Sequence, residues 1–309
     1  MRRHHKRQPT RQPIMSHAVL FPGQGSQFIG MARKLYDEDA TAREWMEAAN
    51  RLMGGELLPI MFEGPEETLR QTRFTQPAIF LHSYVAWKRS GRSADMAAGH
   101  SLGEFTALAA AGALEYEEAF GLVALRGSLM QKAGEESEGT MAAVIGLEDA
   151  SVESLCAQAA EETKSVVVPA NYNSPGQLVI SGSPVGVRHA VRLAEEAGCR
   201  MAKELTVSGA FHSPLMTPAS DGLRERLDAC RFTEPSIPVY SNVTAEASRD
   251  PHRLKENVYT QLLNPVRWTQ TLLNMHADGA VSFTEAGPGN VLRGLMRRTL
   301  KGVETDSVD

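Results

Sequence analysis

One pentapeptide constrains the fold of this chain more than any other segment. Gly99-His100-Ser101-Leu102-Gly103 matches the pattern G-x-S-x-G and lies between an apolar segment, Met96–Ala98, and an alanine-rich segment, Glu104–Ala111. A serine on a sharp strand-to-helix turn leaves no room for side chains two residues before and after it, so both positions require glycine. The pattern therefore predicts a strand, a tight turn and a helix, with Ser101 as a nucleophile. A purely structural turn is the alternative.

The segments around this turn predict alternating strands and helices. Ala18–Phe21 is an apolar run that ends at Pro22-Gly23, which is typical of a buried strand followed by a turn. Helical patterns extend from there to about Ser90, and another helix is expected from Tyr116 to about Ala133. Strand, glycine turn and helix in succession favour an α/β core with a mainly parallel sheet.

The pattern changes over residues 139–207. It predicts strand, helix, strand, strand, helix and strand, which is the order of a ferredoxin-like unit. Because such a unit is self-contained, we expect it to be a small domain inserted into an α/β-hydrolase-like core of residues 16–138 and 208–309. The expected elements of the insert are strands 141–145, 166–169, 177–181 and 201–207 and helices 149–160 and 185–197. After it we expect helix 218–227, strands 238–241 and 281–283, and helix 290–301.

A serine nucleophile needs a general base, and the chain contains nine histidines. His212 is the candidate, because it lies in a small-residue turn after an expected strand, where α/β cores place functional groups. No acidic residue occurs between Ser208 and Ala219 to orient its ring. His100 adjoins the serine, but neighbouring side chains on a tight turn diverge, so a structural role is expected. The others are expected in the tail, in helices or in a polar loop: His4, His5, His17, His82, His189, His276 and His252.

Arg126 lies within an apolar helical segment, Phe120–Gly127. A buried guanidinium without a partner is costly, so this side chain must bind an anion or reach solvent. One hypothesis is that Arg126 binds the carboxylate of a ligand through two parallel hydrogen bonds. The alternative is that the tip of its side chain emerges at the helix surface.

The glycine turn after the first strand, Gly23-Gln24-Gly25-Ser26-Gln27, has some likeness to a dinucleotide-binding loop. Phe28 occupies the position of the third glycine, which that fingerprint needs for packing between helix and strand. We therefore reject a dinucleotide site. The turn can still offer a backbone N–H near the nucleophile.

The distribution of charge disfavours a nucleic-acid-binding protein. The formal net charge of the 309 residues is −5, but Arg2, Arg3, Lys6, Arg7 and Arg11 stand in an N-terminal tail without acids. With those five positive charges set aside, −5 becomes −10 for the rest of the chain. Contacts to phosphate backbones need clustered Lys and Arg, so non-specific nucleic-acid binding is not expected.

Cysteine usage and hydropathy bound the location of the protein. The three cysteines, Cys156, Cys199 and Cys230, lack any C-x-x-C spacing, so neither a disulfide framework nor a metal site is expected. No apolar run approaches the roughly 18 to 20 residues that cross a bilayer. We therefore expect a cytoplasmic protein. Residues 1–15 are expected to be a disordered extension, with an upstream translation start or an Arg-rich leader as alternatives.

Taken together, the motifs resemble the malonyl-CoA:acyl carrier protein transacylases of fatty-acid synthesis and the related acyltransferase domains of polyketide synthases. The resemblance runs from Val19 to about Leu300. Besides Arg126, it rests on the segments FPGQGSQ at 21–27, GHSLGE at 99–104, NYNSPGQ at 171–177, GAFHS at 209–213, NPVRW at 264–268 and EAGPG at 285–289.

The resemblance implies a role for each candidate residue. Ser101 would carry the malonyl group as an ester, and His212 would be the base, oriented by the backbone carbonyl of Gln261 in place of a carboxylate. The backbone N–H groups of Gln24 and Leu102 would form the oxyanion hole. Arg126 would pair with the free carboxylate of malonate and would not emerge at the helix surface. The substrates would be malonyl-CoA and the phosphopantetheine thiol of acyl carrier protein, with no cofactor and no metal.

Two other functions compete with this one. A serine hydrolase would use the same nucleophile but has no use for a cation at Arg126 when its acyl groups are neutral. A non-catalytic scaffold that binds a carrier protein would form no acyl ester on Ser101. Whether the chain serves fatty-acid or polyketide synthesis stays open, and so does its preference for malonyl or methylmalonyl groups. We expect a monomer.

Both expected substrates are anionic, so a body with a net charge of −10 needs a local basic patch to bind them. We expect that patch on the last helix and on the insert. The candidate docking residues are Arg200, Lys203, Arg293, Arg297, Arg298 and Lys301.

Overall fold

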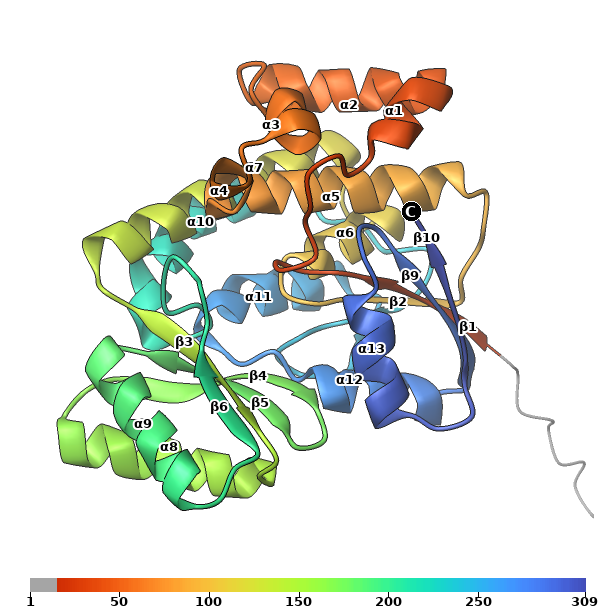
Figure 1. The fold of residues 1–309 in the computed structure, drawn as a ribbon. Helices are drawn as coiled ribbons and strands as arrows, with labels where there is room; N and C mark the ends of the chain where they lie inside the picture. Colours follow the sequence, from red (N-terminus) through yellow and green to blue (C-terminus); the bar gives the residue numbers. More distant parts are fainter. Residues whose placement is uncertain (1–15) are drawn as a thin grey trace, which may run out of the picture.

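The computed structural model describes residues 16–309, which form two β-sheets with helices packed against them (Figure 1). The larger sheet has six strands in the order β10-β9-β1-β2-β7-β8. All its neighbouring strands are parallel except β7 and β8. The strands are β1 (Ser16–Phe21), β2 (Met96–Gly99), β7 (Val239–Tyr240), β8 (Ala247–Ser248), β9 (Ala280–Ala286) and β10 (Glu304–Val308).

The central strand β1 is buried on both faces, as parallel strands in such sheets usually are. Successive side chains point to opposite faces, so Val19 and Phe21 enter one hydrophobic cluster and Ala18 and Leu20 enter another. The second cluster packs against α12 (Trp268–Ala277) and α13 (Val291–Thr299). The sheet is therefore covered by helices on both sides.

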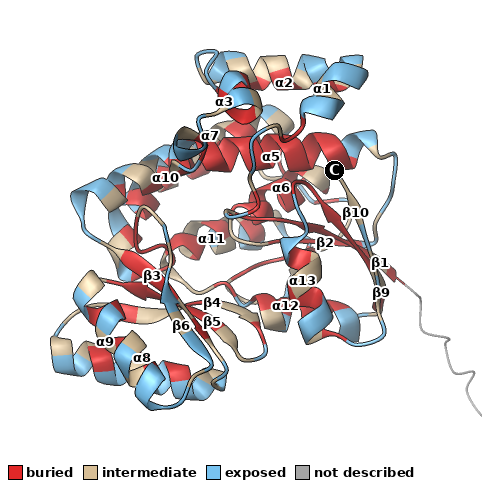
Figure 2. Cartoon of the chain, viewed as in Figure 1, coloured by how far each residue is buried: buried red, intermediate tan, exposed pale blue. Residues whose placement is uncertain are grey.

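The first cluster packs against a thick helical layer. Helix α5 (Thr72–Arg89) is buried on every side from Thr72 to Trp87, apart from Arg73 (Figure 2). It lies between the sheet side and a small outer group of helices, which explains its lack of a polar face. The other helices of the larger part are α1 (Arg33–Glu38), α2 (Ala40–Leu52), α3 (Leu57–Glu63), α4 (Glu66–Leu69), α6 (Gly103–Ala110), α7 (Tyr116–Glu136), α10 (Thr217–Ala229) and α11 (Pro251–Thr260).

The smaller sheet is antiparallel, with the order β4-β5-β3-β6, and has its own hydrophobic cluster. Its elements are β3 (Thr140–Ile145), α8 (Asp149–Thr163), β4 (Val167–Ser174), β5 (Gln177–Gly182), α9 (Pro184–Glu196) and β6 (Met201–Glu204). This confirms the predicted fold class and element order. The division of the chain into domains at residues 139 and 207 stays a prediction.

Strand β4 joins the smaller sheet to the larger part. The N–H of Tyr172 donates to the carbonyl of Val266 at 2.9 Å, and the N–H of Val266 donates to the carbonyl of Ala170 at 2.8 Å. These two bonds form an isolated parallel bridge between β4 and the segment that contains Val266. It lies just before α12, beside the segment that carries the candidate serine.

Several sequence predictions were incomplete or wrong. The strand expected over 201–207 ends at Glu204, and strands β8 and β10 and helix α11 were not predicted. Helix α12 was indicated only by the helical pattern around His276, without bounds. His252, expected in a loop, lies in the first turn of α11: its N–H binds the side chain of Asp250 at 2.9 Å, and Pro251 is the first helical residue. Proline favours that position because it needs no N–H there.

Two further expectations concern location. Within residues 16–309, no helix combines the length and the apolar character needed to cross a bilayer. The three cysteines are unpaired. The expected N-terminal extension, residues 1–15, lies outside the described part of the chain.

Candidate active site

Ser101 sits on a tight turn between the end of β2 and the start of α6, with a left-handed backbone φ of 52°. A Cβ atom at Gly99 would lie 1.9 Å from the carbonyl carbon and oxygen of Gly103. A Cβ at Gly103 would lie 2.2 Å from the carbonyl oxygen of Phe21. The two glycines thus allow the strand, the turn and the helix to approach one another closely, as the motif predicts.

Replacing Gly99 with alanine should destabilise the protein by about 3 kcal/mol, because the added methyl overlaps backbone atoms that cannot move aside. Gly121→Ala is the matched control, since that helical glycine has open space around its Cβ position. The control should raise stability by about 0.5 to 1 kcal/mol. Denaturant unfolding checks both variants. Equal stability of Gly99→Ala and wild type would contradict the geometry described here.

Asn242, just after β7, holds the turn from the other side. Its Oδ1 accepts the N–H of Ser101 at 2.7 Å, and its Nδ2 donates to the carbonyl of Gly99 at 2.7 Å. Asn242 is fully buried. Asn242 was not predicted as a site residue, because nothing local marks an asparagine 141 positions away from the serine.

His212 lies against the serine, as predicted. Its Nε2 is 2.8 Å from Ser101 Oγ, and its Nδ1 lies 3.0 Å from the carbonyl of Gln261 and 3.1 Å from that of Asn264. Two carbonyls at Nδ1 require the proton there, which leaves Nε2 free to accept the serine proton. Gln261 was predicted as the orienting carbonyl, whereas Asn264 was not.

Burial, followed by the charge of nearby Arg126, lowers the pKa of His212 to about 3. The imidazole is therefore neutral at neutral pH. A neutral ring with its proton on Nδ1 is the form that a general base requires.

Arg126 is 1 % exposed and points to the serine from α7. One terminal nitrogen donates to Ser101 Oγ at 3.1 Å and to Gln261 Oε1 at 2.9 Å, and the other donates to Gln76 Oε1 at 2.7 Å. Its Nε is buried without a hydrogen-bond partner among residues 16–309. The alternative that the guanidinium emerges at the surface is therefore wrong.

The guanidinium beside Ser101 is a fixed positive charge in a closed environment. Burial lowers the pKa of Arg126 to about 9, and the nearby carboxylate of Glu104 opposes that shift. The two amide oxygens that hold Arg126 are neutral, so the group lacks a carboxylate in direct contact among the described residues. An acyl group with a free carboxylate would supply one.

The two predicted oxyanion donors lie on either side of the serine. Leu102 follows Ser101 and caps the N-terminus of α6, where backbone N–H groups point out of the helix. The loop of Gln24 packs on the serine turn, since a Cβ at Gly23 would lie 2.5 Å from the carbonyl oxygen of His100. The assignment of the N–H groups of Gln24 and Leu102 to an oxyanion hole stays a prediction.

His100 turns away from the serine, as expected of a structural residue. Its Nε2 lies 2.8 Å from Asn173 Oδ1 on β4, and its ring meets that of Trp268 edge-on at 5.4 Å between centroids. The ring therefore connects the serine turn to the smaller sheet.

A buried carboxylate without a predicted role, that of Glu104, lies behind the site. Glu104 is fully buried in the first turn of α6. Its Oε2 accepts hydrogen bonds from Gln261 Nε2 at 2.6 Å and from the N–H of Asn242 at 3.1 Å. The side chains of Gln261 and Gln76 were likewise not predicted as partners of Arg126.

The structure separates the six candidate docking residues into two groups. Arg298 donates to Gln177 Oε1 on β5 at 2.7 Å, and the N–H of Arg200 donates to the carbonyl of Ile145 on β3 at 2.8 Å. Because Gln177 and Ile145 are paired, both arginines lie at the same end of the smaller sheet. Lys203 lies exposed on β6 of the same sheet, and Lys301 lies exposed just after α13.

The other two arginines turn toward strand β10. Arg293 donates to Ser307 Oγ at 2.7 Å, and Arg297 lies 3.4 Å from Thr305 Oγ1. They therefore stabilise the C-terminal strand against α13. The first group remains the better candidate for a docking surface.

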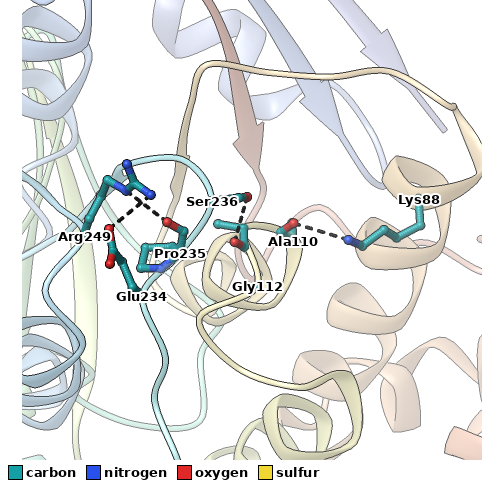
Figure 3. A pocket seen from close by; sticks show the side chains of 8 residues that line it. Lys88, Ala110, Gly112, Glu234, Pro235, Ser236 and Arg249 are labelled. Atoms are coloured by element: carbon teal, nitrogen blue, oxygen red, sulfur yellow. Dashed lines mark hydrogen bonds and ion pairs between the residues drawn. The ribbon is translucent and has the colours of Figure 1, made fainter.

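An open surface pocket of about 430 Å³ lies at the opposite end of α6 from the serine (Figure 3). Lys88 donates there to the carbonyl of Ala110 at 3.3 Å, and Arg249 pairs with Glu234 at 3.1 Å. None of the candidate site residues lines it. The chemistry is concentrated at the other end of the helix.

Comparison with known proteins agrees with this geometry. Residues 19–308 match the family described as acyl transferase domain. The malonyl CoA-acyl carrier protein transacylase of Bacillus subtilis strain 168 is 42% identical over 294 residues, which cover 94% of this chain and 92% of that protein. The Escherichia coli K12 protein of the same name is 41% identical over 285 residues, covering 91% of this chain and 92% of its own.

Solved structures are similar over nearly the whole chain. The crystal structure of an acyl carrier protein S-malonyltransferase from Vibrio cholerae superimposes with a TM-score of 0.90 at 42% identity, covering 95% of this chain and 97% of that one. A malonyl-transacylase in complex with its type II PKS acyl-carrier protein gives a TM-score of 0.90 at 37% identity, covering 95% and 96%.

Proposed function

Because the chain belongs to the acyl transferase domain family, we propose that Ser101 carries the malonyl group from malonyl-CoA to acyl carrier protein as a covalent ester. The chain is an enzyme of malonyl transfer for fatty-acid synthesis. The observation that carries the proposed mechanism is that His212 Nε2 and a terminal nitrogen of Arg126 both lie within hydrogen-bond distance of Ser101 Oγ. A neutral-acyl hydrolase would have no use for the buried guanidinium of that cluster.

The first half-reaction loads the serine. The malonyl carboxylate binds Arg126, His212 Nε2 takes the proton of Ser101, and Oγ attacks the thioester carbonyl. The N–H groups of Gln24 and Leu102 stabilise the oxyanion of the tetrahedral intermediate. When the intermediate collapses, the C–S bond breaks and His212 protonates the leaving sulfur of CoA. The carbonyls of Gln261 and Asn264 hold the ring in place throughout.

The second half-reaction reverses these steps with a different thiol. The phosphopantetheine thiol of acyl carrier protein gives its proton to His212 and attacks the malonyl ester. With a pKa near 8.5, a thiol is a far better donor to imidazole than water is. Collapse of this intermediate returns the proton to Ser101 and releases malonyl-acyl carrier protein. Ser101 and His212 perform every transfer, so the reaction needs no cofactor.

Isotope exchange tests this mechanism. If malonyl-CoA loads the enzyme before the carrier protein binds, labelled CoA should enter the malonyl-CoA pool in the absence of acyl carrier protein. Ser101→Ala should abolish that exchange while leaving the fold intact. Exchange that depends on acyl carrier protein would rule out the separate loading step.

We further propose that acyl carrier protein docks at the end of the smaller sheet where Arg200 and Arg298 both lie. Both arginines are exposed, and Arg298 contacts Gln177 at the start of β5. Lys203 and Lys301 extend this surface, and Arg293 and Arg297 contribute to its positive electrostatic potential from the other side of α13.

We also propose that the protein is cytoplasmic, which the unpaired cysteines support, and that it is a monomer.

Charge reversal tests this docking surface. Arg200→Glu combined with Arg298→Glu should raise the KM for acyl carrier protein by about tenfold at low salt, and less at high salt, while loading by malonyl-CoA stays unchanged. Arg51→Glu, at an exposed arginine at the end of α2, is the matched control and should alter neither step. Equal damage to both half-reactions would refute the docking surface.

A further inference from the structure

Glu104 is a buried carboxylate that the transfer steps leave without a role. It is fully buried three residues after the serine. An isolated buried charge is expensive, and hydrogen bonds to the charged form offset that cost. Both groups that donate to its Oε2, the side chain of Gln261 and the backbone of Asn242, themselves contact the catalytic residues.

One connection runs through Gln261. Its Nε2 donates to Glu104 at 2.6 Å and to the carbonyl of Ser101 at 3.0 Å, and its Oε1 accepts from Arg126 at 2.9 Å. Because Nε2 faces two acceptors and Oε1 faces a donor, the side-chain amide of Gln261 can adopt only one orientation. The backbone carbonyl of the same residue holds Nδ1 of His212. Through Gln261, Glu104 therefore helps to position both His212 and Arg126.

The other connection runs through Asn242. Its backbone N–H binds Glu104, and its side chain holds the N–H of Ser101 and the carbonyl of Gly99. Displacing the backbone of Asn242 would displace both ends of the serine turn. Glu104 thus supports the nucleophile as well.

The charges around the carboxylate indicate a second effect. Arg126 on α7 acts on the carboxylate of Glu104, and Arg126 and His100 both act on the imidazole of His212 in the loop before α10. During transfer, His212 becomes an imidazolium beside the guanidinium of Arg126, with neutral carbonyls at its Nδ1. A negative charge linked through Gln261 lowers the cost of that second cation.

We propose that Glu104 is a positioning residue whose ionised carboxylate, acting through Gln261 and Asn242, aligns Ser101, His212 and Arg126 and balances the imidazolium formed during transfer. The inference rests on the proposed function. Burial raises the pKa of Glu104 to about 7, while the hydrogen bonds from Gln261 and Asn242 oppose that rise. The ionised form therefore gains population as pH rises through about 7. The loading rate should rise over the same range, where His212 stays neutral.

The experiment measures single-turnover loading of Ser101 between pH 5.5 and 8.5. Malonyl-pantetheine serves as donor, because it lacks the phosphates of CoA, which titrate near pH 6. Wild type should load faster as pH rises through about 7. Glu104→Gln keeps the shape without the charge, so it should load about tenfold more slowly at high pH and show no rise. Glu104→Asp keeps the charge at a shorter reach and should retain a rise at a lower rate.

Glu285→Gln is the matched control. Glu285 is also fully buried, on β9, and accepts hydrogen bonds from the N–H groups of Leu292 and Arg293 at the start of α13, at 3.0 and 2.8 Å. Within residues 16–309, no hydrogen bond joins its side chain to Ser101, His212 or Arg126. Its variant should retain the wild-type pH profile. If Glu104 were only a structural residue, Glu104→Gln would also retain the wild-type pH profile.

The outcomes separate the two proposals. If wild type gains no malonyl group on Ser101 at any pH, the proposed function fails. If it does, and Glu104→Gln reproduces the wild-type rate and pH profile, the positioning role fails. Should Glu104→Gln not fold, Glu104→Asp decides, since a loading rate independent of pH in that variant would overturn the role of the charge.

Discussion

His212→Ala is expected to slow the loading of Ser101 by malonyl-CoA about 10⁴-fold. The loss is large because Nε2, 2.8 Å from Oγ, is the nearest group able to take the serine proton, and it also protonates the leaving sulfur. The neutral form of the imidazole is already present, because the pKa of the buried ring is about 3. Rapid-quench measurement of CoA release in a single turnover checks the prediction.

His252→Ala is the control for the loss of an imidazole elsewhere. That histidine is exposed on α11, and its variant should load at the wild-type rate. A His212→Ala enzyme that loads within about tenfold of wild type would require another base. His100 could not easily fill that position, because its ring contacts Asn173 and Trp268.

Arg126→Ala is expected to reduce kcat/KM for malonyl-CoA by about 10²- to 10³-fold, the usual result of truncating one partner of a buried charge pair. Activity on acetyl-CoA, which has no free carboxylate, should fall much less, so the ratio of acetyl to malonyl transfer should rise. Arg126→Lys keeps the charge without the planar fork and should give an intermediate ratio. Competition between the two donors measures this ratio directly.

An unchanged ratio in Arg126→Ala would contradict the carboxylate clamp. The truncation also removes a hydrogen bond to Ser101 Oγ and one to Gln261 Oε1, so both donors should lose some rate. Only the difference between them reports on the substrate carboxylate. That difference also distinguishes an enzyme selective for malonyl groups from one that transfers acyl groups without selection.

Patterns confined to a few neighbouring residues predicted much of the site. The two glycines around Ser101 specify a turn that the structure contains, because the backbones meet at distances no Cβ allows. His212 follows from a loop at the end of an expected strand and the absence of a better histidine. The strand and helix order of the smaller sheet also follows from local periodicity.

Contacts between segments that are far apart in the sequence could not be predicted from local patterns. Asn242, Gln76 and Glu104 reach the site only because β7, α5 and α6 pack around β2, and no local signal distinguishes them from other buried polar residues. The same limit applies to the fold. Strand β10 has four consecutive polar residues and therefore no alternating pattern, and it is a strand because it pairs with β9 along five residues. The burial of Arg126 likewise depends on the surrounding helices.

The central claim is a malonyl ester on Ser101 that acyl carrier protein then removes. The measurement is mass spectrometry of the protein after brief incubation with malonyl-CoA, followed by peptide mapping and by a chase with phosphopantetheinylated acyl carrier protein. We predict one malonyl group on the peptide that contains Ser101, its disappearance during the chase as malonyl-acyl carrier protein forms, and no adduct in Ser101→Ala. A wild-type protein that transfers malonyl groups without ever carrying one, or that carries it equally well after Ser101→Ala, would contradict the account.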